Sequence, residues 1–203
     1  MILSITTLLC ITIGIVSYYS FQDMSLFEKL EFNSYKIVHK SEYYRLFTHA
    51  FVHGDWNHLI INLLVLYSFG SNVEGFFIGN FGSLGSIYYI LLFVLSLPIS
   101  SIVDLIKYKD NPHYNAVGAS GAVSAILFCS IFLNPWGKIY FFAVLPIPGV
   151  LFGAGYIYYS YYMGQKNSDN VGHYAHLTGA LFGFIYPLFI NFNKFLTHFI
   201  QQF

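Results

Sequence analysis

Apolar segments long enough to cross a bilayer recur along this chain and constrain its fold more than any other feature. A helix that spans the hydrocarbon core needs about 20 mainly apolar residues. Six segments meet or approach this length, at residues 2–21, 56–75, 86–105, 116–133, 138–163 and 172–193. Only 9% of the residues are charged, against roughly 25% in soluble domains. We therefore expect an all-α, polytopic membrane protein with six transmembrane helices, forming a single domain over residues 1–203.

The longest polar stretch, residues 22–51, separates the first two segments. It also contains aromatic and aliphatic residues, among them Phe27, Leu30 and Phe32. Long ordered connections of this kind are often functional. We expect this stretch to pack on the membrane surface rather than to serve as a simple connector.

The charge balance excludes one class of partner. Nine Lys and Arg residues face nine Asp and Glu residues, so nothing suggests nucleic-acid binding. Cys10 and Cys129 both lie in apolar segments, which argues against a structural disulfide. The partners that we expect are the lipid bilayer and other membrane proteins.

Ser120 stands in a nest of small residues at the beginning of the fourth segment, within Gly118-Ala119-Ser120-Gly121. Small neighbours would let a substrate backbone approach the hydroxyl. The first N–H groups of a helix lack intrahelical acceptors and can donate to a developing oxyanion. The alternative is close helix packing, for which small residues are common in membranes. From this motif alone, packing is the better explanation.

His176 is an ionisable residue near the start of the sixth segment. Such residues are costly in a membrane and are candidates for functional sites, and neutral imidazole can act as a general base. Gly179 and Gly183 follow on nearly the same helix face and would let this helix press against the fourth. The alternative is a histidine that is hydrogen-bonded at the membrane interface.

His58 and Asn62 stand four residues apart in the second segment, and therefore share one helix face. Two donors that converge on one point are suited to an oxyanion hole. The alternative is a hydrogen-bonded pair between helices.

A histidine-rich metal site is a competing interpretation. His49, His53 and His58 are spaced by four and five residues, and His173 and His176 by three, which could place imidazoles around zinc. No cysteine or glutamate accompanies them in a known zinc pattern. We therefore expect no metal and no cofactor.

Four motifs taken together are more specific than any one of them. In chain order they are Tyr44-Arg45-Leu46-Phe47-Thr48-His49-Ala50-Phe51-Val52-His53, His58-x-x-x-Asn62, Gly118-Ala119-Ser120-Gly121 and Ala175-His176-x-x-Gly179-x-x-x-Gly183. The combination resembles the rhomboid family of intramembrane serine proteases. The likeness covers nearly all of the second to sixth segments.

The resemblance implies a six-helix, rhomboid-like bundle with a Ser–His dyad and no acidic third member. Ser120 would be the nucleophile and His176 the general base, while His58, Asn62 and the backbone N–H of Ser120 would form the oxyanion hole. Expected substrates are transmembrane segments of other membrane proteins that unwind locally, cut after a small residue. We expect a multi-pass protein of a bacterial cytoplasmic membrane. The alternative is a non-catalytic relative that binds membrane clients.

Two positions depart from the family pattern. Tyr44 replaces the tryptophan of a Trp-Arg pair whose arginine matches Arg45. Ser124 stands four residues after the nucleophile, where an aromatic residue often packs on the catalytic imidazole, so that another aromatic side chain would have to replace it.

Glu74 matches an acidic residue that is expected to be structural.

Two expectations concern the arrangement of the helices. Pro146 and Pro148 fall inside the predicted fifth helix, where proline would kink it and favour lateral substrate entry; an ordinary kinked helix is the alternative. The family topology puts the N-terminus inside, which would leave seven of the nine Lys and Arg residues outside. This count opposes the positive-inside rule.

Overall fold

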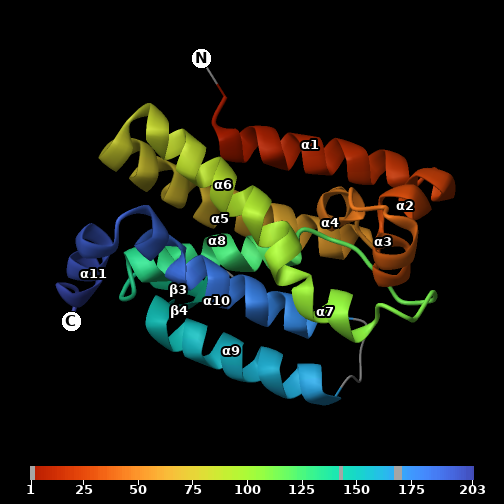
Figure 1. Ribbon diagram of the computed structural model, residues 1–203. Coiled ribbons are helices and arrows are strands. Elements are labelled where there is room, and N and C mark those ends of the chain that lie inside the picture. Colours follow the sequence, from red (N-terminus) through yellow and green to blue (C-terminus); the bar gives the residue numbers. More distant parts are fainter. Residues whose placement is uncertain (1–2, 142–143, 167–170) are drawn as a thin grey trace.

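Helices dominate the computed structural model, which describes residues 3–141, 144–166 and 171–203. The six main helices are α1 (Ile5–Ser20), α5 (Trp56–Phe81), α6 (Ser83–Ser100), α8 (Ser120–Leu133), α9 (Gly149–Lys166) and α10 (His173–Ile190). Figure 1 shows α8 and α10 side by side in the middle of the bundle, between α6 and α9. The predicted helical membrane bundle is confirmed.

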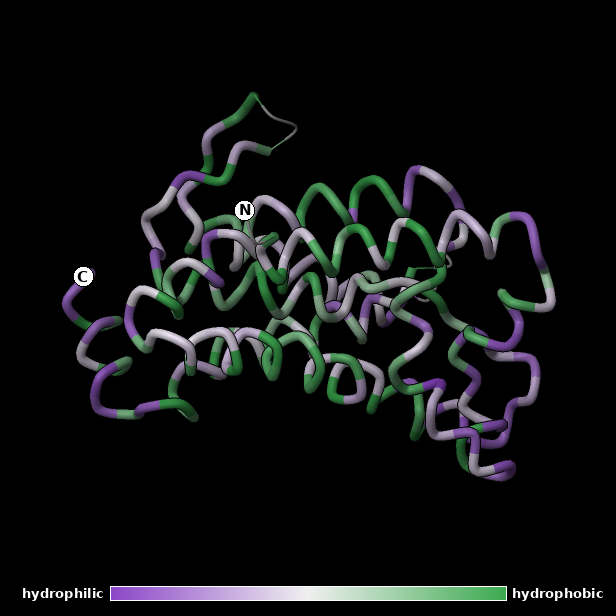
Figure 2. The backbone as a smooth tube through the Cα atoms, turned by 90° about the horizontal axis from the view of Figure 1, so that it is seen from above, coloured by the Kyte–Doolittle hydropathy of each residue, from purple (hydrophilic) through white to green (hydrophobic). Residues whose placement is uncertain are grey.

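The outward faces of the helices are apolar, as contact with lipid requires. On α5, Ile60, Ile61 and Leu64 are exposed, and on α6 so are Leu84 and Ile87. Figure 2 shows hydrophobic residues along the helices and many hydrophilic residues towards the two ends of the bundle. An aqueous solvent would penalise so much exposed apolar surface, which a bilayer accommodates.

The predicted number of six membrane crossings stays a prediction. By length and composition, Trp56–Phe81 and Ser83–Lys107 can cross a membrane among the described residues, while Ile5–Ser20 and Ser120–Leu133 are apolar but shorter. The helices His173–Ile190 and Phe192–Ile200 meet the criteria for a membrane span only when they are taken together, and the chain bends by 118° between them. The second of these, α11, was not expected. The Asn191 side chain caps it by accepting the N–H of Lys194 at 3.0 Å.

The predicted fifth segment begins too early. Lys138–Phe141 (β3) pairs antiparallel with Leu145–Pro148 (β4), and α9 begins only at Gly149. A proline disfavours the helical conformation of the residue before it, so Pro146 and Pro148 keep Leu145 and Ile147 extended. The expectation that these prolines kink the fifth helix is therefore wrong, because both precede it.

The predicted fourth segment also begins too early. Asn115–Ala116 (β2) pairs antiparallel with Phe32–Asn33 (β1), and α8 begins at Ser120. Between them, Gly118 has a φ of 108°, which side chains other than glycine rarely adopt. The chain therefore turns at Gly118, and Ser120 becomes the first residue of a helix.

The polar stretch after α1 folds into short elements held together by Arg45. They are α2 (Met24–Leu30), β1, α3 (Ser34–Lys40), α4 (Arg45–Thr48) and the 3-10 turn η1 (His49–Phe51). The buried Arg45 guanidinium donates to the carbonyls of Glu28 and Glu31 at 2.8 and 2.7 Å. Its Nε lies 2.6 Å from the Glu42 carboxylate, which lowers the pKa of Glu42. Arg45 thus has a structural role.

Two further short helices complete the chain. Ile102–Lys107 (α7) continues from α6, and α11 turns back under α8. The carbonyl of Leu133, at the end of α8, lies 2.9 Å from His198 Nε2 and accepts a hydrogen bond from Gln202 at 3.0 Å. These contacts satisfy a helix-end carbonyl that has no partner within α8.

Glu74 ties the first helix to the bundle. Its buried carboxylate accepts the N–H groups of Ile5 and Thr6 at 2.8 and 2.9 Å and the Thr6 hydroxyl at 2.7 Å. A carboxylate at a helix N-terminus is favourable because the N–H groups there lack intrahelical acceptors. The Thr6 hydroxyl also lies 2.8 Å from that of Tyr89 on α6.

We predict that Glu74→Gln lowers stability. The amide keeps the shape but loses one acceptor oxygen, which leaves a buried donor unsatisfied at a cost of about 1–3 kcal/mol. Thermal unfolding in detergent should show a clearly lower midpoint. The exposed Glu28→Gln is the matched control and should unfold like the wild type. Equal midpoints for both variants would contradict the role given to Glu74.

Candidate active site

Backbone contact between α8 and α10 forms the centre of the site. A side chain at Gly179 would collide with the backbone of Gly121, and one at Gly183 with the backbone of Ala125. Glycine therefore lets the two helices approach as closely as their main chains permit. The predicted packing of the sixth segment against the fourth is confirmed.

Ser120 and His176 both adjoin this contact. A Cβ atom at Gly121 would lie 3.5 Å from the carbonyl oxygen of Ala175. Ser120 precedes Gly121 and His176 follows Ala175, so the two residues lie beside one crossing of the helices, and both are half-buried. The Thr178 hydroxyl donates to the carbonyl of Ser100 at 2.7 Å, which fixes α10 against the end of α6.

The loop before Ser120 is pinned by His49. The N–H of Gly118 donates to the carbonyl of His49 at 2.9 Å, and His49 Nδ1 lies 3.3 Å from the carbonyl of Gly118. Since a carbonyl only accepts, Nδ1 must carry the proton. A side chain at Gly118 would also lie about 2.6 Å from the His58 ring, so glycine is needed there for space as well as for its φ.

His53 continues this network from the other side of the loop. The N–H of Ala119 donates to His53 Nε2 at 3.5 Å, and His53 Nδ1 lies 2.9 Å from the hydroxyl of Ser17. Nε2 accepts, so Nδ1 carries the proton and donates to Ser17. The Ser17 hydroxyl in turn donates to the carbonyl of Phe51 at 2.8 Å. This chain of bonds joins α1 to the residue before Ser120.

Burial keeps both histidines neutral. It lowers the pKa of His49 to about 4 and that of His53 to about 3. For His53, the neighbouring imidazole of His58 lowers the pKa further. Both values lie well below the ordinary pKa of about 6.5. The hydrogen bonds that hold the loop therefore require the neutral imidazoles.

His58 lies in the first turn of α5, where this helix meets the loop, and Asn62 follows one turn later. Asp55 caps α5 by accepting the N–H of His58 at 2.8 Å, and the His58 ring packs against Gly118. Asn62 is buried, and its amide donates one N–H to the carbonyl of His58 at 2.9 Å. The Asn62 amide has a second N–H, which takes no part in that bond. His58 is thus close to the loop that carries Ser120, one turn before Asn62.

An aromatic ring from α9 lies against His176. The Tyr156 and His176 rings are stacked, with centroids 6.2 Å apart and planes 30° apart. The Tyr156 hydroxyl lies 2.6 Å from that of Ser124. The aromatic residue missing at position 124 is thus replaced by one from another helix. Sequence reasoning could only signal that some replacement was needed.

The histidine spacings that could indicate zinc have another explanation. His49 and His53 are engaged with the backbone of Gly118 and Ala119. Within the described ranges, no group of three or more His, Cys, Asp or Glu side chains is arranged to hold a metal ion. Sequence reasoning missed this role because a four-residue spacing does not distinguish a metal ligand from a hydrogen-bonding residue.

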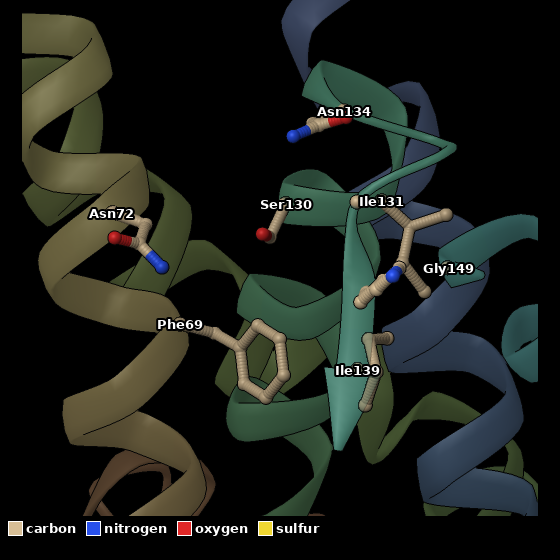
Figure 3. Close-up of a pocket in the computed structure, with 9 residues that line it drawn as sticks. Phe69, Asn72, Ser130, Ile131, Asn134, Ile139 and Gly149 are labelled. Carbon is tan, nitrogen blue, oxygen red and sulfur yellow. The ribbon is translucent and has the colours of Figure 1, made fainter. Parts of the chain in front are cut away.

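A separate cavity lies at the other end of α8. Its volume is about 190 Å³, and Asn72, Ser130 and Asn134 point into it (Figure 3). Ten residues of helix separate Ser120 from Ser130, or about 15 Å. This cavity therefore does not belong to the site at Ser120.

Comparison with known proteins identifies relatives. Residues 40–191 match the family model described as the Rhomboid domain. A stretch of 143 residues is 32% identical to RHOMBOID-like protein 12, mitochondrial, from Arabidopsis thaliana, covering 66% of this chain and 43% of the relative. Rhomboid-like protein 11, chloroplastic, from the same plant is 34% identical over 158 residues, covering 70% and 51%. The chain thus spans about half the length of these two relatives.

A bacterial protein is similar over more of its length. Rhomboid protease GlpG from Haemophilus influenzae is 28% identical over 191 residues, which cover 90% of this chain and 86% of that protein.

The pKa values of the loop histidines predict acid sensitivity. Between pH 6.5 and about 3, the unfolded chain binds a proton at His53 that the folded chain does not, so stability falls as the pH falls through this window. One such proton changes stability by at most about 1.4 kcal/mol per pH unit. In His53→Gln, the unfolding midpoint in detergent should fall less steeply with acid.

The control for this prediction is His113→Gln, in which an exposed histidine is replaced. Its midpoint should follow the wild-type curve from pH 7 to 4. If the unfolding midpoint of His53→Gln fell with acid as steeply as that of the wild type, His53 would not be the cause of the pH dependence.

Proposed function

The chain belongs to the rhomboid family, and on that premise we propose that it is an intramembrane serine endopeptidase. It cleaves transmembrane segments of other membrane proteins with Ser120 as nucleophile and His176 as general base. The observation that carries this proposal is the close contact at Gly121 and Ala175, beside which both residues lie. The family includes a relative whose name is that of a protease.

The first half of the reaction forms an acyl-enzyme. Ser120 Oγ attacks the scissile carbonyl carbon while His176 takes its proton. The tetrahedral intermediate then collapses, the C–N bond breaks, and His176 gives the proton to the leaving nitrogen. The first product leaves with a new amino terminus.

The second half regenerates the enzyme. Water attacks the acyl carbon, and His176 takes a proton from it. The ester bond to Ser120 breaks, and the proton returns to the serine oxygen. The second product leaves with a new carboxyl terminus.

The oxyanion hole consists of His58, Asn62 and the backbone N–H of Ser120. Ser120 is the first residue of α8, where the N–H group has no intrahelical acceptor. The N–H groups of Gly118 and Ala119 donate to His49 and His53, and these bonds fix the direction of the Ser120 N–H before substrate arrives. Preorganised donors of this kind stabilise the charge that develops in the transition state.

The substrate must present an extended backbone to Ser120. A helix hides its carbonyls in internal hydrogen bonds, so a transmembrane segment that unwinds easily, with a small residue before the cut, is the expected substrate. The protein is an integral membrane protein, and we place it in the cytoplasmic membrane of a bacterium.

We predict that a fluorophosphonate labels Ser120. Ser120→Ala removes the oxygen that attacks phosphorus and displaces fluoride, and His176→Ala removes the base, so both variants should lose labelling. Mass spectrometry of the labelled peptide measures this, together with cleavage of a model transmembrane substrate in liposomes. Ser130→Ala, on the same helix, and His113→Ala are matched controls that should label like the wild type.

The binding-module alternative predicts a different outcome. A protein that only holds membrane clients would show neither labelling nor cleavage in the folded wild type. That result would overturn the proposed function.

Asn62→Ala tests the oxyanion hole. Loss of one donor typically costs about 100- to 1000-fold in turnover, while stability should change little because the bond to His58 lies within one helix. Asn72→Ala is a close control, since Asn72 donates to the carbonyl of Ser68 in the same way, at 3.0 Å, ten residues further along α5. Wild-type turnover in Asn62→Ala would remove Asn62 from the hole.

A further inference from the structure

Residues of α8 and of its own helix hold Tyr156 against His176. Its hydroxyl lies 2.6 Å from that of Ser124 on α8, and its ring packs on Phe128, with centroids 5.4 Å apart. Phe152, one turn earlier on α9, stacks on it at 6.2 Å. The ring therefore has a defined position next to the imidazole.

Ser124 makes this arrangement possible. It is 3% exposed and lies one turn after Ser120 on α8. An aromatic side chain there would occupy the space that Tyr156 fills. The small serine leaves room for the ring and supplies the partner for its hydroxyl.

The contacts of α9 differ in kind from those of α10. The α8 and α10 backbones touch at Gly121 and Gly179, with no side chain between them. At Gly153, α9 meets side-chain atoms of α8, since a Cβ atom there would lie 3.3 Å from Phe128 Cε1. At Gly164, α9 likewise meets side-chain atoms of α10, since a Cβ atom there would lie 3.3 Å from Tyr174 Cζ. A displacement of α9 across these side-chain contacts would move Tyr156 relative to His176.

From these contacts we infer that Tyr156 is a positioning residue for His176, and that the seating of α9 controls the alignment of the base. This inference rests on the proposed function. With α9 against α8, the ring restricts the imidazole to one orientation. With α9 displaced, His176 loses this support. Small misplacements of catalytic groups can cost about 100-fold in rate.

The first test measures the rate of fluorophosphonate labelling of Ser120 in purified full-length protein. Tyr156→Ala removes the ring and should lower the rate tenfold or more. Tyr156→Phe and Ser124→Ala break the same hydrogen bond from opposite ends, so both should give the same, smaller loss. Tyr158→Ala, an exposed tyrosine of the same helix, is the control and should label like the wild type.

A second variant separates positioning from general structural support. Ser124→Tyr combined with Tyr156→Ala moves the ring from α9 to α8, and the labelling rate should recover to within a few fold of the wild type. With a model substrate, Tyr156→Ala should lower kcat with little change in KM. A loss that is not rescued by the relocated ring would overturn the positioning role.

The dependence on α9 has its own test. Gly153→Leu would press on Phe128 and push α9 outward. In the otherwise wild-type protein, Gly153→Leu should slow labelling of Ser120. In the variant that combines Ser124→Tyr with Tyr156→Ala, it should have little further effect on the labelling rate. An equal loss in both backgrounds would overturn the control by α9.

The outcomes distinguish this inference from the proposed function. No labelling of the wild type overturns both. Wild-type labelling together with an unchanged rate in Tyr156→Ala overturns the inference alone. Should Tyr156→Ala not fold, Tyr156→Phe and Ser124→Ala decide, because wild-type rates in both would also overturn it.

Discussion

The backbone contact between α8 and α10 is the constraint on which the site depends. Apolar packing between helices gains little in lipid, because the lipid tails are as apolar as the side chains. Gly121, Gly179 and Gly183 instead allow main-chain atoms to touch, which maximises dispersion contacts. The two residues proposed as nucleophile and base adjoin this contact, which thereby sets their relative position.

Neutral histidines complete the site by fixing the loop that leads into Ser120. His49 and His53 hold the backbone of Gly118 and Ala119, and His53 extends the connection to Ser17 on α1. The first helix is in turn anchored at its other end by Glu74. Polar residues that are costly in a membrane thus lie where they bond to backbone groups near the site or at a helix end.

Much of this could be predicted from the sequence, because apolar runs, glycine stripes and polar insertions carry physical requirements of their own. The beginning of α9 was also predictable, since Pro146 and Pro148 keep the residues before them extended. Asn191 likewise signalled a new helix by its capping preference. The role of Tyr156 was not predictable. Nothing in the local sequence indicates that a residue 32 positions beyond Ser124 bonds to Ser124 and packs on the His176 imidazole. The roles of His49 and His53 required the fold of the loop at Gly118.

Joint action of Ser120 and His176 at one site can be tested with an inhibitor that reacts with both. A 4-chloroisocoumarin acylates an active serine and, with loss of chloride, alkylates an adjacent imidazole. Peptide mass spectrometry of the treated protein in detergent therefore shows whether both residues have reacted. We expect one adduct that joins the peptide containing Ser120 to the peptide containing His176. Adducts on other serines, or acylation of Ser120 at an unchanged rate in His176→Ala, would contradict it.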